Sequence, residues 1–374
     1  MTDRYMAQEY KLSVITVNYN GLEDTCSLLA SLPHDDPDME LIVVDNASAR
    51  DEAAEISARC PYAHVIRNSV NSGFAGGNNV GIRASHGRYV LLINNDAVIG
   101  GNDTDINTND AVTEGNNATG GGNGTDININ NAAGGRSNAV GEEKSTTVIK
   151  KISAVIGEIS AVIGDNDSVS GGNVARRGLD ALMDRLASSE TIGIVCPKIR
   201  YYYGAREIQY AGYTPLSGIT LRNRAIGNGE ADSGQYDTPH PTPYAHGAAM
   251  MLSRAAIDAV GLLPECFFLY YEELDYSMMM RRAGYEIWYE PACTVYHKES
   301  RTTGADSPLR AFYMTRNRLL FTRRNVRAPQ RYVSYLYLAV LVAARDVLRA
   351  LLRRRAELAA ATVRGVLSFI FKKS

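Results

Sequence analysis

The sequence lacks a dominant charge. Its 374 residues include 39 lysines and arginines against 41 aspartates and glutamates, for a formal net charge of −2. A chain this balanced has no overall attraction to nucleic acid, and any basic surface must be local. Five scattered cysteines form no Cys-x-x-Cys pair, which argues against a zinc site and favours reduced thiols. No apolar stretch follows the polar N-terminus, so we expect a cytoplasmic protein without a secretory signal.

Several common catalytic motifs are absent as well. The sequence has no Gly-x-Ser-x-Gly, no cysteine in a helix-opening motif and no Walker A sequence. These absences give no support to a serine or cysteine nucleophile, or to a P-loop nucleotide site.

What is present is an alternation of strand and helix signals over the first hundred residues. β-Branched or apolar runs at 12–17 and 41–44 alternate with helical stretches near 21–32 and 51–59. This order implies a mainly parallel sheet with helices on both faces. In such sheets ligands bind at the carboxyl ends of the strands. Polar residues end three of the predicted strands: Thr16 and Asn18, Asp45 and Asn46, and Asn94, Asn95 and Asp96.

A compositional break follows. Residues 100–177 are dominated by Asn, Gly, Asp, Ser and Thr and contain no aromatic residue. The sequence Ala-Val-Ile-Gly-Gly-Asn-Asp at 97–103 returns almost unchanged at 161–167, as an inserted or duplicated segment would leave it. Polar low-complexity sequence cannot bury enough apolar surface to offset its ordering entropy. We therefore expect a largely flexible insertion, whose role as a lid, an acceptor-contacting arm or a passive passenger stays open.

Calcium binding is one alternative for this segment. Asp103, Asp105 and Asn107, with Glu114 at the twelfth place, imitate an EF-hand loop. Thr108 replaces the turn glycine, however, and no helical pattern flanks the loop. Calcium is therefore the weaker interpretation.

Crowded carboxylates and a glycine-rich turn supply candidate chemistry. Glu272, Glu273 and Asp275 lie close together in the sequence, and like charges raise one another's pKa, which suits a general base near neutrality. Helix N-termini also favour acidic residues, so a structural role is an equal alternative. The turn at 73–78, Gly-Phe-Ala-Gly-Gly-Asn, could bring a phosphate or sugar close to backbone, or only meet a backbone constraint.

Asp96 and His297 are candidate metal ligands. An aspartate at the carboxyl end of a strand can hold a divalent ion that grips a diphosphate, although a helix cap or turn is the commoner role. His297 alone is more often a structural histidine than a ligand. Neither residue decides the function without the others.

Taken together, these segments resemble family 2 glycosyltransferases of the GT-A fold, particularly bacterial rhamnosyltransferase-like members. The resemblance covers about 11–99 and 178–325. Its motifs follow the family's order: 14–21 (Val-Ile-Thr-Val-Asn-Tyr-Asn-Gly), 43–48 (Val-Val-Asp-Asn-Ala-Ser), 71–79 (Asn-Ser-Gly-Phe-Ala-Gly-Gly-Asn-Asn), 92–96 (Leu-Ile-Asn-Asn-Asp), 246–251 (His-Gly-Ala-Ala-Met-Met), 270–275 (Tyr-Tyr-Glu-Glu-Leu-Asp), 296–297 (Tyr-His) and 316–318 (Arg-Asn-Arg).

The resemblance implies an activity and its metal. The activity is inverting transfer of a sugar from a UDP- or dTDP-sugar, dTDP-rhamnose among the candidates, to a glycan or lipid-linked acceptor in cell-surface polysaccharide synthesis. Asp96 looks like the last residue of the family's Asp-x-Asp motif for Mg²⁺ or Mn²⁺. Asn94 stands where the first Asp is usual, a departure that should weaken metal binding until the diphosphate adds its own oxygens. His297 is the implied second ligand.

The resemblance also assigns the base and the donor site. Glu273 takes the general-base position, where the family usually has an Asp one methylene shorter, with Glu272 and Asp275 beside it. The implied donor-binding residues are Thr16, Asn18, Asp45, Asn46, Ser48, Gly73, Phe74, Gly76, Asn78, Asn94 and Asn95.

The C-terminal tail is apolar and basic. Residues 332–344 are apolar but about half as long as a membrane span requires, and arginines interleaved with Leu, Val and Ala follow. A basic amphipathic helix pair suits peripheral attachment to the anionic inner leaflet; packing against its own domain or a dimer partner is the alternative. The predicted parts are 1–99 (nucleotide-sugar-binding half), 100–177 (insertion), 178–325 (acceptor and catalytic half) and 326–374 (tail).

Two other functions stay open. A nucleotidyltransferase could share this type of sheet, but it would need a Lys- or Arg-bearing loop after the first strand, and residues 18–21, Asn-Tyr-Asn-Gly, carry no positive charge. A catalytically silent nucleotide- or sugar-binding scaffold is the second alternative. The sequence leaves the oligomeric state open.

Overall fold

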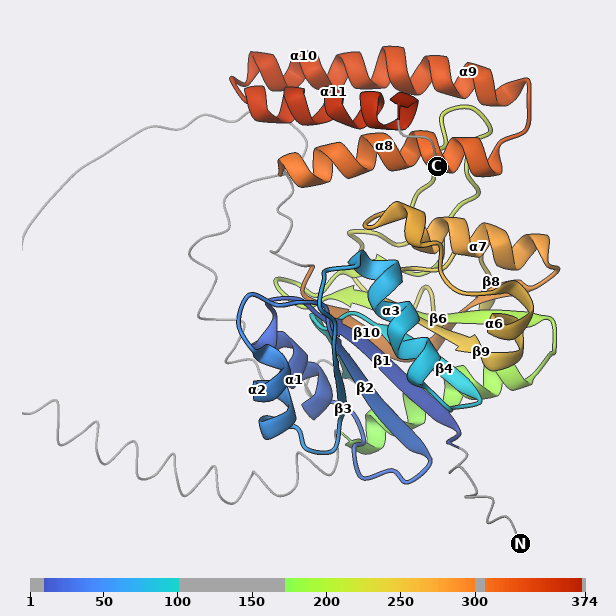
Figure 1. Ribbon diagram of the computed structural model, residues 1–374. Coiled ribbons are helices and arrows are strands. Elements are labelled where there is room, and N and C mark those ends of the chain that lie inside the picture. The colour runs from blue at the N-terminus through green and yellow to red at the C-terminus, as the bar shows by residue number, and fades with distance from the viewer. Residues whose placement is uncertain (1–9, 101–171, 300–306, 372–374) are drawn as a thin grey trace, which may run out of the picture. The chain divides into compact units, whose positions relative to one another are not determined.

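A computed structural model describes residues 10–100, 172–299 and 307–371 (Figure 1). The predicted insertion at 100–177 lies outside the described residues except for Gly100 and 172–177, and the calcium-loop alternative at 103–114 lies wholly outside them.

The described residues build one mixed sheet of ten strands, ordered β3-β2-β1-β4-β9-β6-β10-β5, with β7 paired to β6 and β8 to β10. β1, β2, β3 and β4 run parallel, and β6 and β10 share their direction because β9 is antiparallel to both β4 and β6. The sheet is therefore mainly parallel, as predicted. The strands are β1 Leu12–Asn18, β2 Met39–Asp45, β3 His64–Arg67, β4 Tyr89–Ile93, β5 Ala97–Gly100, β6 Ile192–Tyr201, β7 Ile208–Tyr210, β8 His240–Pro241, β9 Ala249–Ser253 and β10 Glu286–His297.

Helices cover both faces of this sheet, which confirms the predicted fold class. Leu12 and Val14 of β1 join one core with α1, α2 and a helix at 172–187, whereas Ile15 joins a second core with α3, α6 and α7. The alternation follows from the two-residue period of a strand, which sends neighbouring side chains to opposite faces. The helices are α1 Leu22–Ala30, α2 Glu52–Arg59, α3 Gly73–Ala84, α6 Arg254–Val260 and α7 Glu272–Arg282, with the 3-10 helix η1 Glu265–Phe267.

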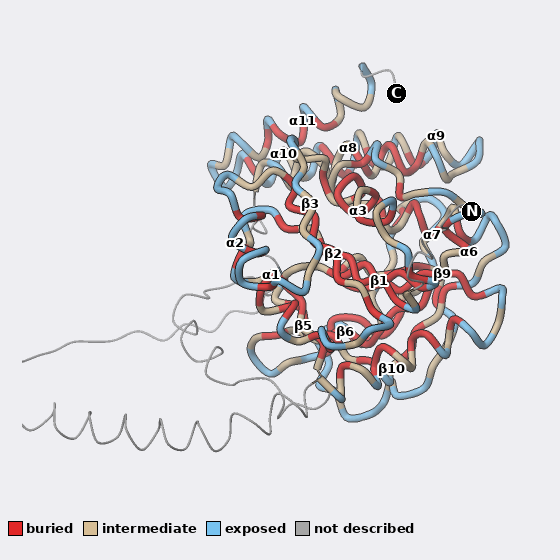
Figure 2. The backbone as a smooth tube through the Cα atoms, turned by 60° about the horizontal axis from the view of Figure 1, so that its bottom comes forward, coloured by how far each residue is buried: buried red, intermediate tan, exposed pale blue. Residues whose placement is uncertain are grey.

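The C-terminal helices form a further layer on α8. Leu319, Leu320 and Phe321 of α8 pack against Leu338 and Val342 in a third apolar core. Most positions of β1, β2, β4, β6 and β9 are buried, whereas exposed ones are frequent on α10 and α11 (Figure 2). The elements are α8 Pro308–Asn325, α9 Gln330–Leu336, the π-helical segment η2 Tyr337–Val342, α10 Ala343–Leu352 and α11 Ala356–Phe371.

Gly365 allows a close approach between α11 and α8. A Cβ on Gly365 of α11 would lie 2.7 Å from the carbonyl oxygen of Phe312 in α8, so only glycine allows the two backbones to approach this closely. The predicted helical tail is thus present, with one side packed against α8. Among the described residues, none of the helices combines the length and apolarity needed to cross a bilayer.

Candidate active site

Polar side chains at the carboxyl ends of β1 and β2 are tied to one another. Asn18 lies opposite Asp45 in the parallel ladder, and its Nδ2 donates to Asp45 Oδ1 at 2.8 Å and to Glu52 Oε2 at 2.9 Å. Its Oδ1 accepts from Thr25 Oγ1 at 2.7 Å. The hydroxyl of Ser48 donates to Asp45 Oδ1 at 2.6 Å. The structure thus brings Asn18, Asp45 and Ser48 together, and their side chains are hydrogen-bonded to one another; their role in donor binding stays a prediction.

Asn46 organises the turn that precedes α3. Its Nδ2 donates to Asn71 Oδ1 at 3.0 Å and to the carbonyl of Gly73 at 3.1 Å, while its Oδ1 accepts from the backbone N–H and hydroxyl of Ser72. Thr16 lies two residues before Asn18 on β1, and its hydrogen bonding differs from that of these residues. Its Oγ1 is buried and has no hydrogen-bond partner in the described structure, so its hydrogen-bonding capacity is unused.

Backbone constraints account for the glycine-rich turn. Gly73 has φ +74°, and a Cβ there would lie 2.0 Å from the carbonyl oxygen of Phe268, to which Phe74 N donates at 2.8 Å. A Cβ on Gly76 would lie 2.6 Å from the side chain of Ser72, and Asn78 Nδ2 donates back to Phe74 at 3.0 Å. These contacts dock α3 onto the loop before α7; donor contact by this turn stays a prediction.

Asp96 and His297 meet beyond the end of β4. His297 Nε2 lies 3.3 Å from Asp96 Oδ1 and 3.3 Å from Asn94 Nδ2. Asp96 Oδ2 is buried without a partner in the described structure. Gln209 Oε1 lies 2.9 Å from His297 Nδ1. Because an amide oxygen only accepts, Nδ1 carries a proton, and whenever the ring is neutral its Nε2 keeps a lone pair. In that form Nε2 and the free carboxylate oxygen of Asp96 are a suitable pair of ligands for a divalent cation.

Asn95, the middle residue of the predicted Asn-Asn-Asp cluster, points elsewhere. Its Nδ2 donates to Thr25 Oγ1 at 3.1 Å and lies 3.4 Å from the carbonyl of Gly21. The side chain therefore fastens α1 to the end of β4 rather than joining Asp96. In the parts of the chain that the structure describes, no cluster of three or more His, Cys, Asp or Glu residues could hold a metal by protein ligands alone.

Three carboxylates begin α7, and their surroundings separate their roles. Asp275 is fully buried and accepts from the guanidinium of Arg324 at 2.9 Å and from Asn325, so it joins α7 to α8. Glu272 is 3% exposed, and its Oε2 has no partner in the described structure. Burial, and then the charge of Glu273, holds the pKa of Glu272 well above its usual range. Burial also raises the pKa of Glu273.

The segment before β9 connects Glu273 with the Asp96 region. A Cβ on Gly247 would lie 3.6 Å from Glu273 Cγ, and the carbonyl of Ala248 accepts from Asn94 N at 2.9 Å. His246 stacks on Tyr213 with ring centroids 6.0 Å apart. Burial, and then the charge of His297, lowers the pKa of His246 to about 3, so its ring is neutral at physiological pH.

Sequence reasoning missed three positioning residues. Gln209 orients His297 from 88 residues away, and no local signal marks it. Arg324 binds Asp275, and Asn317 Nδ2 lies within 2.7–3.0 Å of the carbonyls of residues 267, 269 and 270. The motif at 316–318 contained Asn317, but its function was not assigned from the sequence.

Comparisons with known proteins point in the same direction. Residues 13–103 match the family model described as "Glycosyl transferase family 2". "Low-salt glycan biosynthesis hexosyltransferase Agl10" of Haloferax volcanii is 24% identical over 363 residues, 95% of this chain and 90% of that protein. An uncharacterized glycosyltransferase of Haemophilus influenzae is 37% identical over 86 residues, 23% of this chain and 29% of the other.

Solved structures of glycosyltransferases also align with the chain. One is the mannosyltransferase PcManGT of Pyrobaculum calidifontis in complex with GDP-Man and Mn²⁺, with a TM-score of 0.48 and 13% identity over 97% of this chain and 88% of that one. None of these matches identifies a rhamnosyltransferase, so that subtype stays a prediction. The family model and the hexosyltransferase relative support a family 2 glycosyltransferase.

Proposed function

We propose that this chain is an inverting glycosyltransferase of glycan biosynthesis that transfers a hexose from a UDP- or dTDP-sugar to an acceptor hydroxyl. One arrangement carries the proposal: residues 246–248 approach Glu273 at Gly247 and bind Asn94 at Ala248, so one segment connects the candidate base with the Asp96–His297 pair and its unpartnered carboxylate oxygen. Inverting transfer requires the attacking hydroxyl and the departing diphosphate to lie on opposite sides of the sugar, and the proposal assigns them to these two groups.

Asp96 Oδ2 and His297 Nε2 would hold Mg²⁺ or Mn²⁺. The fit rests on the buried, unpartnered oxygen and on the lone pair that Gln209 leaves at Nε2. When bound, the ion supplies positive charge to the departing diphosphate. With one anionic protein ligand, binding should be weak until a nucleoside diphosphate contributes its own oxygens.

Glu273 would accept the proton of the acceptor hydroxyl. Its raised pKa brings it closer to neutrality than an ordinary glutamate, which improves proton transfer in the transition state. The acceptor oxygen would attack the anomeric carbon in one displacement, so the configuration inverts. Gly247 leaves the space beside Glu273 free of a side chain.

Among the described residues predicted to bind the donor, Thr16 has a side-chain hydroxyl with no hydrogen-bond partner. Asn18, Asp45 and Asn46 hold one another and their neighbours, so they would shape the nucleoside pocket more than reach into it. The unpartnered Thr16 hydroxyl would contact the nucleoside directly.

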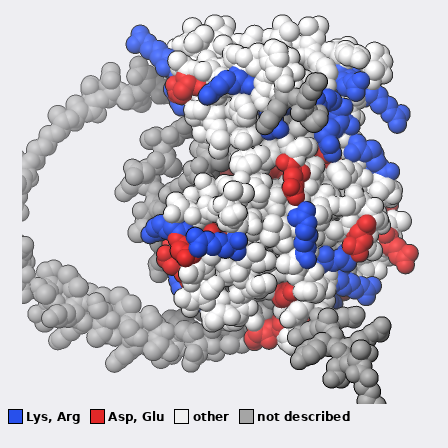
Figure 3. All heavy atoms as spheres, viewed as in Figure 1, with Lys and Arg blue, Asp and Glu red and all other residues white. Residues whose placement is uncertain are grey.

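The tail would attach the enzyme peripherally to an anionic inner leaflet, on the cytoplasmic side. Residues 326–374 contain ten Lys and Arg against two Asp and Glu, and blue side chains lie at the ends of the helical layer at the top of Figure 3. Leu348, Leu351 and Leu352 of α10 are 54–76% exposed. Cationic residues beside exposed leucines suit such a surface, at about 1 kcal/mol for each Lys or Arg near it.

Co-sedimentation with vesicles tests the attachment. Phosphatidylglycerol vesicles should bind the protein and phosphatidylcholine vesicles should not, and Leu351→Asp with Leu352→Asp should abolish the binding. Val70→Asp, at a 67% exposed valine outside the tail, is the control. Equal binding to both vesicles, or none, would contradict the proposal.

Calorimetry tests the transferase itself. UDP and dTDP are titrated with and without Mn²⁺ into wild type, Asp96→Ala and the exposed control Asp35→Ala. Metal-dependent binding that only Asp96→Ala loses would support the donor site, and sugar nucleotides of that base, dTDP-rhamnose included, would then be assayed for transfer. Binding of neither nucleotide would refute the proposal. Tight binding without any turnover of a sugar nucleotide would favour the silent scaffold.

A further inference from the structure

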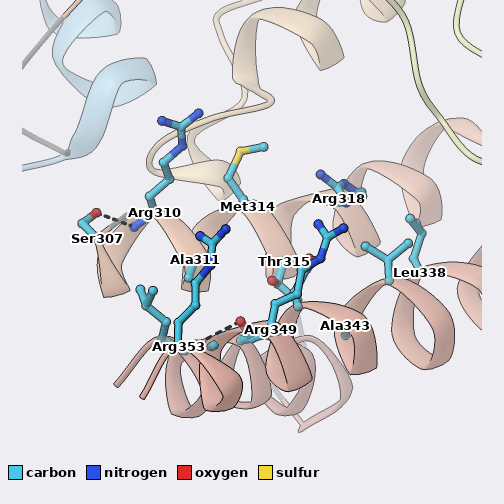
Figure 4. Close-up of a pocket in the computed structure, with 15 residues that line it drawn as sticks. Ser307, Arg310, Ala311, Met314, Thr315, Arg318, Leu338, Ala343, Arg349 and Arg353 are labelled. Carbon is cyan, nitrogen blue, oxygen red and sulfur yellow. Dashed lines mark hydrogen bonds between the residues drawn. The ribbon is translucent and has the colours of Figure 1, made fainter. Parts of the chain in front are cut away.

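A pocket of about 250 Å³ lies between α8 and the helices that follow it (Figure 4). It is smaller than the roughly 300–1,000 Å³ of sites that enclose a whole small molecule, so it suits one charged group and the start of a chain. Four arginines and one acidic residue line it. The residues used below are Arg310, Met314, Arg318, Leu338, Asp346, Arg349 and Arg353.

The four arginines of this pocket outnumber its one acidic residue, Asp346, whose charge acts on Arg318. Arg349 and Arg353 extend from the end of α10 toward α8 (Figure 4), and neither forms an ion pair with an acidic residue in the described parts of the chain. The carboxylate of Asp346 also pairs at 2.7 Å with Arg345, which does not line the pocket. Cations gathered without counter-charges favour a bound anion, and guanidinium groups match phosphate geometry.

Apolar side chains form much of the remaining wall. Met314 and Leu338 line the same pocket, and the outer side of the same helical run exposes Leu341 (61%) and Leu348 (58%). An inorganic anion would gain nothing from these groups. A phosphate carrying a hydrocarbon chain would bury that chain along them.

Two contacts connect the pocket to the base. The Arg310 guanidinium lies 5.9 Å from the ring centre of Tyr270, and Arg318 Nε donates to Tyr271 Oη at 2.9 Å. Both tyrosines have left-handed backbone, with φ 68° and 78°, and they directly precede Glu272 and Glu273. An anion held by the arginines would therefore lie next to the segment that presents Glu273.

We propose that this pocket binds the phosphate or diphosphate group of a lipid-linked acceptor, an inference that rests on the transferase function proposed above. The arginines would hold the anionic linkage, the apolar wall would take the first part of the lipid chain, and the sugar at the other end of the linkage would reach Glu273.

Farnesyl diphosphate, titrated into the full chain, tests the pocket. The variant Arg349→Gln with Arg353→Gln should bind it at least about 10-fold more weakly, because it loses two guanidinium groups whose hydrogen bonds to a phosphate are charge-assisted. Arg327→Gln with Arg364→Gln removes the same charge at exposed tail positions outside the pocket and should bind as wild type. Unchanged binding by the first pair, or equal losses in both pairs, would overturn the proposal.

Two further probes separate the sources of the anion. Inorganic diphosphate should bind more weakly than farnesyl diphosphate; equal affinities would show a free-phosphate site and overturn the lipid assignment. The same proteins are titrated with UDP and Mn²⁺. Asp96→Ala should keep farnesyl diphosphate binding and lose UDP, and the pocket variant should do the reverse, so that failure of the transferase site and failure of the pocket give different results.

Discussion

Asn317 offers a quantitative test of how α8 presents the base. Its fully buried side chain faces three carbonyl oxygens, those of Phe267, Leu269 and Tyr270, at 2.9, 2.7 and 3.0 Å. An amide carries two hydrogens for these three acceptors. Phe267 O also accepts from the backbone N–H of Leu269 at 2.8 Å, so it keeps a partner when the amide is removed. The other two carbonyls lose theirs.

Asn317→Ala should therefore cost two hydrogen bonds. An acceptor left without its donor costs about 1–3 kcal/mol, and because this loop is partly exposed the lower end applies, about 2–3 kcal/mol in all. The residues released are those with left-handed backbone, Tyr270 and Tyr271, which immediately precede α7. Turnover should then fall while UDP binding is kept, because Asn317 binds the loop before α7 and, in the described structure, makes no hydrogen bond with Asp96 or His297.

Urea unfolding and single-turnover kinetics measure the two effects. Thr322→Val is the control on the same helix, since the Thr322 hydroxyl donates only to the carbonyl of Arg318 within α8; we expect a loss of no more than about 1 kcal/mol and unchanged turnover. The reasoning is refuted if Asn317→Ala loses less than the control, or if it lowers stability without affecting turnover.

Three further predictions follow from the same contacts. Glu273→Gln should lower turnover by about 10²–10⁴-fold with UDP affinity retained. In the wild type, turnover should fall as the pH drops through the raised pKa of Glu273, at higher pH than for an ordinary glutamate. A fall in turnover only in the usual glutamate range would contradict this. The raised pKa of Glu272 means that its ionised form destabilises the fold. The free energy of unfolding, measured with urea, should therefore decrease more as pH rises through that pKa in the wild type than in Glu272→Gln, where of these two carboxylates only Glu273 keeps a raised pKa; equal decreases would contradict this. Gln209→Leu should weaken Mn²⁺-dependent UDP binding by about 10–100-fold, as loss of a group that orients a metal-bound histidine does; unchanged calorimetry would show that Gln209 does not orient a metal ligand.

The sheet and its two covered faces could be predicted because the strand signals are local. Apolar runs at 12–17, 41–44 and 89–93 alternate with helical patterns, and neighbouring side chains of a strand must face opposite cores. The convergence of polar residues at one rim follows from parallel strands alone. The proximity of Asn18 and Asp45, which lie side by side in the ladder, follows from this geometry without further information.

The direction in which each side chain points could not be predicted in the same way. Asn94 and Asn95 are neighbours of the same type, yet one lies 3.3 Å from His297 and the other reaches Thr25 of α1. The difference depends on tertiary contacts of the loop between β4 and β5. The contact of Gln209 with the His297 ring could not be predicted either, because it depends on the pairing of β7 with β6.

Helix α8 is the element on which the base and the tail both depend. Asn317 holds the loop before α7, and Arg324 holds Asp275 within its first turn. Arg310 and Arg318 line the pocket that the tail helices complete. A chain ending after α8 should therefore keep the carboxylates of α7 in place, because these contacts remain, while losing Arg349 and Arg353. It would also uncover Leu319 and Leu320, which pack against η2. Point substitutions in the pocket thus separate acceptor binding from stability in a way that truncation cannot.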